Sequence, residues 1–192
     1  MRESELSAPY LPAAMRGDTA AWDRILGVWG PAVLRWCARL GGPRIDTEDA
    51  AHDVFERAFT HAHMIRDPAA FPGWLFATTR RVVIDHRRRA WLRRWVPGLV
   101  PDVLAPGAES RAERDNLAAA VREALEDMPA ELREVIVLCE LEERNGAEVA
   151  ELLGVPLGTV KSRLRRARER FEAEARRRGL APDAPALGRV NG

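Results

Sequence analysis

Residues 147–168 read AEVAELLGVPLGTVKSRLRRAR, and they have the spacing of a helix-turn-helix. Ala150 is small enough for two helices to approach closely, and Gly154 can take a left-handed turn conformation at little cost. Val160 can then pack the second helix against the first. We therefore predict two helices joined by a tight turn near Gly154; an ordinary helical hairpin with a basic surface is the weaker alternative.

The second of these helices has two different faces. At about 100° per residue, its apolar side chains share one face, which we expect to be buried: Val160, Leu164, Ala167 and Phe171. The remaining face is small, polar and basic. A face of this kind suits the major groove of DNA, where Arg can bind guanine through two hydrogen bonds. The predicted contact residues are Gly158, Thr159, Lys161, Ser162, Arg165 and Arg166.

A further amphipathic helix precedes this motif, with Leu132, Val135, Ile136 and Cys139 on its buried face. Cys139 is interpreted as a small core residue rather than a reactive thiol. Cys37 and Cys139 form no CxxC motif and no disulfide framework, which indicates a reducing, cytoplasmic compartment. No apolar run reaches the ~18 residues that span a bilayer, and the first residues do not resemble a signal peptide.

Charge is distributed unevenly along the 192 residues, although the formal net charge is only +1. Residues 80–94 hold seven Arg and one acid, and residues 161–178 hold nine basic residues and three acids. Between them, residues 102–151 hold fourteen acids and five Arg. Two basic blocks separated by an acidic stretch suggest two contacts with a polyanion; solvated helix faces are the alternative.

Helical periodicity dominates the N-terminal half. Residues 19–40 are predicted as one long helix or two shorter ones divided at Pro31, ended by the GGP at residues 41–43. The next helix begins near Asp46, which can cap it together with Thr47. A loop over residues 64–73 and a helix over residues 74–89 complete a compact helical domain.

A Pro- and Gly-rich stretch, VPGLVPDVLAPGA at residues 96–108, divides the chain and is predicted to be a linker. The predicted organisation is an N-terminal extension (1–14), a first helical domain (15–95), a linker (96–112), a second helical domain (113–178) and a disordered tail (179–192). The predicted fold class is all-α.

Several motifs together resemble one family. Residues 124–138, ALEDMPAELREVIVL, and 154–168, GVPLGTVKSRLRRAR, are similar to the C-terminal DNA-binding domain of extracytoplasmic-function (ECF) RNA polymerase sigma factors. In the first domain, DTEDAAHDVFERAF at residues 46–59, FPGWLF at 71–76 and IDHRRR at 84–89 resemble the same family. The resemblance implies two small helical domains, sigma-70 regions 2 and 4, which bind core RNA polymerase and direct promoter recognition and transcription initiation.

The resemblance also implies roles for single residues. Region 4 would bind the −35 promoter element. An acidic helix would meet a basic coiled coil of the largest polymerase subunit through Glu48, Asp49, Asp53 and Glu56, unless these residues form a solvated face. The loop with Arg66, Asp67 and Phe71 would capture a base extruded from the −10 element. The residues expected to contact promoter phosphates are Arg80, Arg81, Arg87, Arg88 and Arg89. An anti-sigma factor is an expected partner.

Some residues depart from the family pattern or leave alternatives open. Thr78 and Arg81 stand where Ile and Asn are common, and His52 where Gln is common, which affects the expected −10 preference. Trp74 could stack on a base, although its place at the start of an apolar helix favours the core.

Two other classes of function compete with this interpretation. Asp49 and His52 have a metal-ligand spacing, but no second motif of this kind exists, and no phosphate loop or catalytic triad is apparent. We therefore expect no enzyme activity, no metal and no cofactor. The main alternative is a helix-turn-helix regulator that binds operator DNA as a dimer, without acting as a polymerase subunit.

Overall fold

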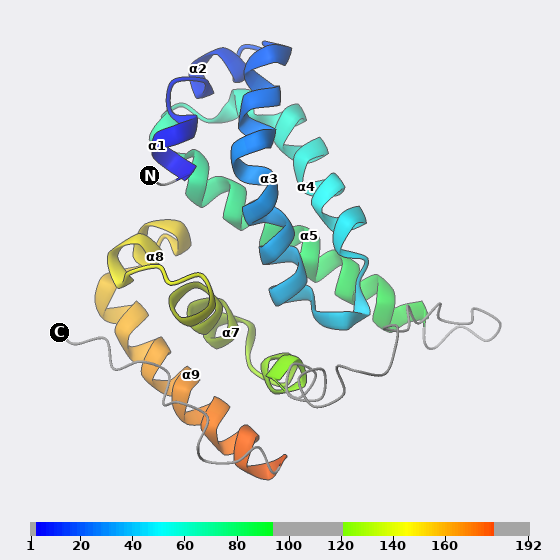
Figure 1. Ribbon diagram of the computed structural model, residues 1–192, viewed down its shortest axis with the longest axis vertical. Coiled ribbons are helices and arrows are strands. Elements are labelled where there is room, and N and C mark those ends of the chain that lie inside the picture. The colour runs from blue at the N-terminus through cyan, green and yellow to red at the C-terminus, as the bar shows by residue number, and fades with distance from the viewer. Residues whose placement is uncertain (1–2, 94–120, 179–192) are drawn as a thin grey trace, which may run out of the picture. The chain divides into compact units, whose positions relative to one another are not determined.

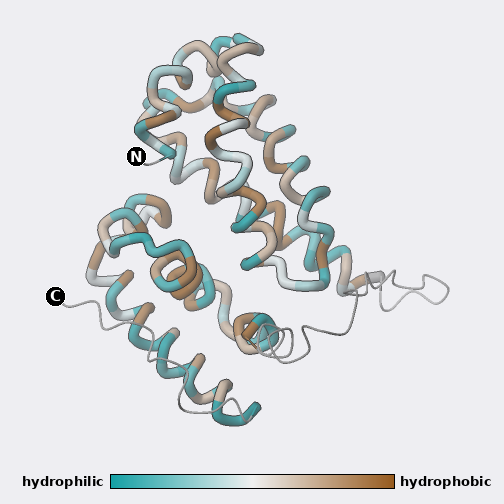
Figure 2. The backbone as a smooth tube through the Cα atoms, viewed as in Figure 1, coloured by the Kyte–Doolittle hydropathy of each residue, from teal (hydrophilic) through white to brown (hydrophobic). Residues whose placement is uncertain are grey.

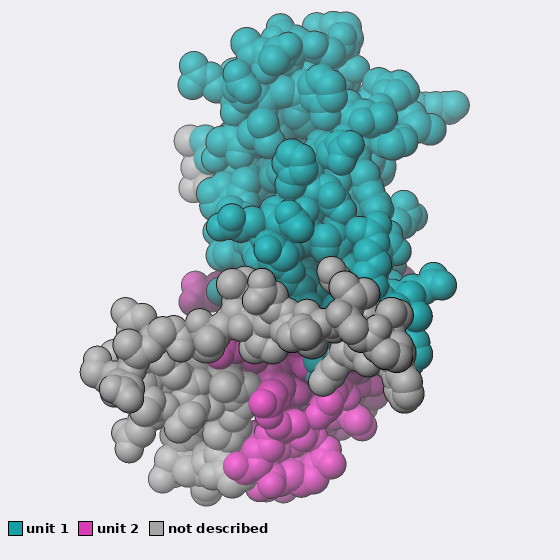
Figure 3. Space-filling view, turned by 90° about the vertical axis from the view of Figure 1, so that its right-hand side faces the viewer, with its two compact units in different colours: residues 1–97, 152–154 teal, residues 98–151, 155–192 magenta. Residues whose placement is uncertain are grey.

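The computed structural model describes residues 3–93 and 121–178, and every regular element within them is a helix. The chain divides into two compact units, residues 1–97 with 152–154 and residues 98–151 with 155–192 (Figure 3). The predicted all-α fold class is confirmed. The predicted linker and tail lie outside the described residues, and the predicted domain boundaries stay predictions.

The first unit is built on α3, which runs from Thr19 to Gly41 (Figure 1). Asp18 caps this helix, because its side chain accepts a hydrogen bond of 3.0 Å from the Ala21 N–H. Pro31 lies on the exposed side and does not divide the helix, so one of the two predicted alternatives, a single helix, is confirmed. Gly42, with φ of +68°, ends the helix as expected from the GGP.

Two further helices, α4 from Thr47 to His61 and α5 from Phe71 to Arg93, pack against α3. Their shared core is aromatic: the Trp36 ring lies 5.1 Å from Phe76, and Trp29 lies 6.2 Å from Phe71, both edge to face. All four rings are buried. Edge-to-face pairs stabilise a fold by about 0.5–1.5 kcal/mol beyond the area they bury. Figure 2 shows brown, hydrophobic residues recurring along α3 and α5.

Residues 3–14 contribute to this core. Helices α1, Glu3–Ser7, and α2, Leu11–Ala14, contact α3. Leu11 and Ala14 are buried, at 3% and 2% exposure. The segment treated above as an N-terminal extension therefore packs as part of the first unit. Helices of five and four residues are too short to show a helical period in the sequence.

Short 3₁₀ turns connect the long helices: η1 at Gly42–Arg44, η2 at Ala62–Met64 and η3 at Pro68–Ala70. The chain turns sharply between α3 and α4. A Cβ atom at Gly41 would overlap the end of the Ile45 side chain, so a larger residue there would require this side chain to move.

The second unit contains a short helical segment at residues 121–126, α7 at Ala130–Ile136, a π-helical turn at Val137–Leu141, residues 146–151 of α8 (Gly146–Leu153) and α9 at Leu157–Arg177. Helix α7 packs along α9. The centre of this unit is apolar and almost fully buried; it contains Val135, Leu138, Val149, Val160 and Ala167. The predicted arrangement of an amphipathic helix before a helix-turn-helix is confirmed.

Candidate nucleic-acid interface

The helix-turn-helix is fixed by local hydrogen bonds at both ends of α8. At its start, Asn145 N–H donates to Glu148 Oε2 at 2.9 Å, and Glu148 N–H donates to Asn145 Oδ1 at 3.0 Å. This reciprocal pair satisfies two N–H groups that a helix start leaves without partners. At its end, Gly154 has φ of +65°, and the Val155 N–H donates to the Ala150 carbonyl. The predicted glycine turn is confirmed.

Helix α9 presents a polar face to solvent. Gly158, Lys161, Ser162, Arg165 and Arg166 are exposed, and Thr159 is half-buried. In Figure 2, hydrophilic residues predominate along this helix. A helix with one exposed basic face can enter a major groove without rearrangement of the unit that carries it.

The opposite face of α9 is buried less completely than the periodicity predicts. Val160 and Ala167 are buried at 1% and 0% exposure, whereas Leu164 and Phe171 are half-buried within the described part of the chain. Helical spacing assigns all four to one face but does not determine how far the neighbouring helices extend over that face.

Within the described part of the chain, the predicted contact residues of α9 form few hydrogen bonds or ion pairs with other residues. Arg165 Nη1 lies 3.2 Å from Glu169 Oε1, with both side chains more than half exposed. Ion pairs of this kind contribute little, about 0.3–0.5 kcal/mol, so Arg165 can leave Glu169 for a stronger partner. The Ser162 hydroxyl donates to the Thr159 carbonyl at 3.0 Å.

One buried and one half-buried arginine, which the sequence analysis did not single out, hold the second unit together. Arg133 is 8% exposed and donates to the carbonyls of Leu125, Glu126 and Met128 at 2.5, 2.7 and 2.8 Å. It thereby satisfies carbonyls at the end of the helical segment 121–126. Arg168 Nε donates to Glu140 Oε1 at 2.8 Å, which joins α9 to the π-helical turn. In the sequence, the burial of Arg133 could have been inferred only from its position in a mostly apolar helix.

In the first unit, the predicted base-capture loop separates into exposed and buried parts. Arg66 and Asp67 are exposed, and the Asp67 side chain caps η3 by accepting from the Ala69 N–H at 2.9 Å. Phe71 is fully buried, with its ring 6.4 Å from Trp22. Phe71 therefore anchors the loop in the core, and the assignment of this loop to the −10 element stays a prediction. Trp74, which lies 6.1 Å from Phe71, is half-buried.

The predicted phosphate-contacting arginines of α5 fall into two groups. Arg80, Arg81 and Arg88 are exposed. Arg87 Nη1 instead donates to the Leu40 carbonyl at 3.2 Å, and Arg89 Nη1 lies 3.8 Å from Asp53 Oδ2. The last two arginines therefore also join α5 to α3 and α4.

The acidic residues of α4 also include exposed residues and one that bonds to a neighbouring helix. Glu48, Asp49 and Glu56 are exposed, and the N–H groups of Glu48 and Asp49 donate to the Asp46 side chain, which caps the helix as predicted. Asp53 differs, because its Oδ2 accepts a hydrogen bond of 2.9 Å from the largely buried His86 Nε2. Asp53 thus links α4 to α5, and its assignment to the polymerase-binding surface stays a prediction.

Both cysteines lie in apolar surroundings. Burial raises the pKa of the Cys37 thiol to about 12 and that of the Cys139 thiol to about 11. For Cys139 the nearby Glu140 carboxylate raises the pKa further, and Arg168 partly opposes this effect. Cys37 is buried but Cys139 is half-buried, so the prediction of a core position for Cys139 is only partly met.

The described residues hold neither a cluster of metal ligands nor a membrane-spanning helix. No three His, Cys, Asp or Glu side chains in residues 3–93 and 121–178 are grouped to hold a metal ion. None of the described helices combines the length and the apolar character needed to cross a membrane.

Comparison with protein families matches each unit to a separate domain. Residues 27–93 match Sigma-70 region 2, and residues 118–171 match Sigma-70 region 4. The fold and the exposed faces are therefore those of a sigma-70-type protein with regions 2 and 4. The chain belongs to the ECF RNA polymerase sigma factors of the sigma-70 family.

Individual relatives support this assignment. The chain is 35% identical over 162 residues to ECF RNA polymerase sigma factor SigE of Mycolicibacterium smegmatis, covering 81% of this chain and 63% of that protein's length. It is 32% identical to SigM of Mycobacterium tuberculosis, with 88% and 85% covered, and 27% identical to SigW of Bacillus subtilis, with 84% and 92% covered.

Solved structures show the same fold. CnrH, in a complex with the cytosolic domain of CnrY, is 26% identical with a TM-score of 0.63, covering 85% of this chain and 93% of CnrH. RpoE of Bartonella quintana, solved with the anti-sigma factor NepR, has a TM-score of 0.60 at 22% identity, with 81% and 96% covered.

Proposed function

We propose that this protein binds core RNA polymerase in the cytoplasm and directs it to promoters, acting by binding rather than by catalysis. The observation that carries the proposal is the exposed face of Lys161, Ser162 and Arg165 on a helix-turn-helix, in the same chain as an exposed acidic helix. An operator-binding regulator needs only the first of these features. A polymerase subunit needs both.

In this proposal α9 enters the major groove at the −35 element. Arg165 and Lys161 are long enough to reach base edges from the exposed face, while Arg166 on its flank contacts the backbone. The weak Arg165–Glu169 pair costs little to break on binding.

The first unit would act at the −10 element. Arg66 and Asp67 lie exposed in the loop before α5, where they can meet an extruded base. Arg80, Arg81 and Arg88 follow on the exposed side of α5 and supply positive charge for the adjacent phosphates. Phe71 would support the loop from the core.

Core polymerase would bind at the exposed acidic residues of α4, Glu48, Asp49 and Glu56. Charge complementarity at such a surface speeds association and fixes the register of the complex. We propose in addition that an anti-sigma factor controls access to these surfaces, since the structurally similar RpoE was solved with the anti-sigma factor NepR.

The proposal is tested by in vitro transcription with purified core polymerase and a library of promoters. We expect transcripts that start at defined sites and depend on this protein. A variant with Glu48→Lys and Asp49→Lys should lose most of the transcript because it binds core polymerase weakly, whereas an Arg24→Ala control, an exposed residue of α3, should not. Absence of any promoter-dependent product from the wild-type protein would contradict the proposal.

A further inference from the structure

Lysine is used only once in this chain. Lys161 is the single lysine among 192 residues, and the remaining 29 of the 30 Lys and Arg residues are arginine. The two side chains carry the same charge but differ in chemistry. An arginine guanidinium stays protonated in proteins, whereas a lysine amine can lose its proton and then attack an activated acyl group. Lys161 is therefore the one side-chain amine of this sequence that can be acylated.

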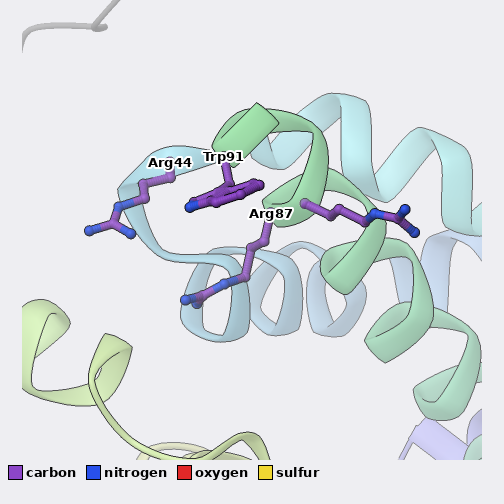
Figure 4. Close-up of a pocket in the computed structure, with 4 residues that line it drawn as sticks. Arg44, Arg87 and Trp91 are labelled. Carbon is purple, nitrogen blue, oxygen red and sulfur yellow. The ribbon is translucent and has the colours of Figure 1, made fainter. Parts of the chain in front are cut away.

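The basic side chains at the end of α5 show the contrast. Arg44, Arg87 and Arg88, together with Trp91, line a pocket of about 240 Å³ (Figure 4). The three positive charges that line this pocket are all guanidinium groups. Because a guanidinium keeps its proton, an acyl donor would leave these charges unchanged. The charge that acylation can remove lies instead on α9.

The amine of Lys161 is accessible. Lys161 is exposed, and its side chain forms no hydrogen bond or ion pair within residues 3–93 and 121–178. Its neighbours one helical turn earlier, Leu157 and Gly158, have no polar side chain. A Cβ atom at Gly158 would meet nothing within 4 Å. An acyl donor can therefore approach Lys161 without displacing a partner.

The charge of Lys161 belongs to the surface that is proposed to read DNA. Arg165 lies one turn further along α9, at about 40° from Lys161 around the helix axis. No acidic residue stands three or four positions from Lys161, so no carboxylate on this side of the helix offsets its charge. Acetylation would replace an ammonium group, which has three N–H donors, with a neutral amide. One of the three charges of Lys161, Arg165 and Arg166 would then be lost.

We propose that Lys161 is an acetylation site, at which an activated acetyl donor weakens recognition of the −35 element. This inference rests on the proposed function, because it assumes that the exposed face of α9 meets DNA. The donor is an acyl phosphate or an acyl thioester, both of which offer a carbonyl carbon with a good leaving group.

The reaction is a simple acyl transfer. The unprotonated Nζ of Lys161 attacks the carbonyl carbon of the donor, and a C–N bond forms. The bond from this carbon to the phosphate oxygen or to the thiol sulfur breaks, and the leaving group takes the electron pair. The amine proton goes to solvent, and nothing is oxidised or reduced.

The experiment treats the complete protein with acetyl phosphate or with acetyl-coenzyme A, removes the donor and then adds untreated core polymerase. Peptide mass spectrometry locates the acetyl group and separates Lys161 from the α-amino group. We expect acetylation at Lys161 and roughly tenfold weaker binding to a promoter that the untreated protein transcribes, because a cationic contact with a base edge is lost. Thermal unfolding should not change, since Lys161 has no partner to lose within the described residues.

Two variants isolate Lys161 from any acetylation elsewhere. Lys161→Arg keeps the positive charge and removes the amine, so treatment should leave its affinity equal to that of its own untreated sample. Lys161→Gln carries a neutral amide, and without treatment it should bind the promoter about as weakly as acetylated wild-type protein.

The outcomes separate this site from the proposed function. Fully acetylated Lys161 with unchanged promoter affinity would overturn the proposal, and so would an equal loss of affinity in treated Lys161→Arg. It is also overturned if both donors acetylate Lys161 in urea-unfolded protein but neither does so in native protein. Acetylation by either donor supports the proposal, and the donor that reacts at the lower concentration identifies the source of the acetyl group. If untreated wild-type protein directs no transcription, the proposed function itself fails.

Discussion

Helices α5 and α9 are both rich in arginine, but their arginine side chains differ in whether they bond to neighbouring helices. On α9 all the predicted contact residues except the half-buried Thr159 are exposed, and the attachments described for them are local: the Arg165–Glu169 pair and the hydrogen bond from Ser162 to the Thr159 carbonyl. On α5, Arg87 is bonded to the Leu40 carbonyl and Arg89 lies near Asp53. The comparison teaches that tertiary neighbours, rather than the number of charges in a helix, decide which charged side chains are available to a partner.

The largest effect should come from an arginine that has no role at the surface. Arg133→Ala leaves three carbonyls near the end of the segment 121–126 without their donor. Since hydrogen bonds to charged groups contribute about 1.5–3 kcal/mol, we expect the free energy of unfolding to fall by about 3 kcal/mol. Urea denaturation followed by circular dichroism measures this loss. Arg166→Ala, an exposed control, should change the free energy of unfolding by less than ~0.5 kcal/mol. Equal losses in the two variants would contradict the claim that Arg133 stabilises the fold and Arg166 does not.

The next effect concerns DNA rather than stability. Arg165→Ala should weaken −35 recognition by about 2 kcal/mol and relax specificity at one base pair, because a bidentate contact with a base is lost. Binding of the polymerase complex to a set of −35 variants measures both quantities. An equal loss on every sequence would show that Arg165 contacts a phosphate and that another side chain reads the base.

A smaller effect should separate Asp53 from the other acidic residues of α4. Asp53→Asn weakens the hydrogen bond with His86 and the ion pair with Arg89, so we expect a loss of about 1 kcal/mol in the free energy of unfolding. Glu56→Gln, an exposed neighbour on the same helix, should leave the free energy of unfolding within ~0.5 kcal/mol of wild type. Thermal and urea denaturation measure the free energy of unfolding of the two variants. Equal values would show that Asp53 contributes no more to stability than the exposed Glu56.

The smallest expected effect at neutral pH concerns the chemical reactivity of the Cys37 thiol. Burial raises its pKa to about 12 from the ordinary 9.0, and only the thiolate is reactive. In a Cys139→Ser variant, iodoacetamide should modify native protein at pH 7.5 far more slowly than urea-unfolded protein. Because the folded pKa is higher than the unfolded one, the contribution of Cys37 to stability is intact below about pH 9 and is lost as the pH rises towards 12. Equal labelling rates of native and unfolded protein would contradict this account.

The parts of the structure that follow from local sequence are the parts that could be predicted. The cap at Asp46, the turn at Gly154 and the exposed face of α9 depend on residues within a few positions of each other. The hydrogen bond of Asp53 to His86 spans 33 residues, and that of Arg87 to Leu40 spans 47. No local pattern encodes such contacts, and for this reason the sequence does not distinguish the charged residues of α4 and α5 that bond to other helices from those that do not.

The same reasoning explains the burial of Phe71 and the packing of the first helices. Phe71 belongs to a motif that resembles a DNA-contacting loop, but an aromatic side chain next to the rings of Trp22, Trp29 and Trp74 is more stable when buried. Helices α1 and α2 are too short to have a recognisable period, and their place in the first unit depends on the surface that α3 offers.

DNA footprinting tests most directly the proposal that the two units bind separate promoter elements. On one promoter fragment, the protein is added alone, core polymerase alone, and both together. We expect protection at two separate segments, the −35 and −10 elements, only when both are present, with permanganate-reactive thymines in the −10 segment. A two-fold symmetric footprint from the protein alone, unchanged by core polymerase, would contradict the account.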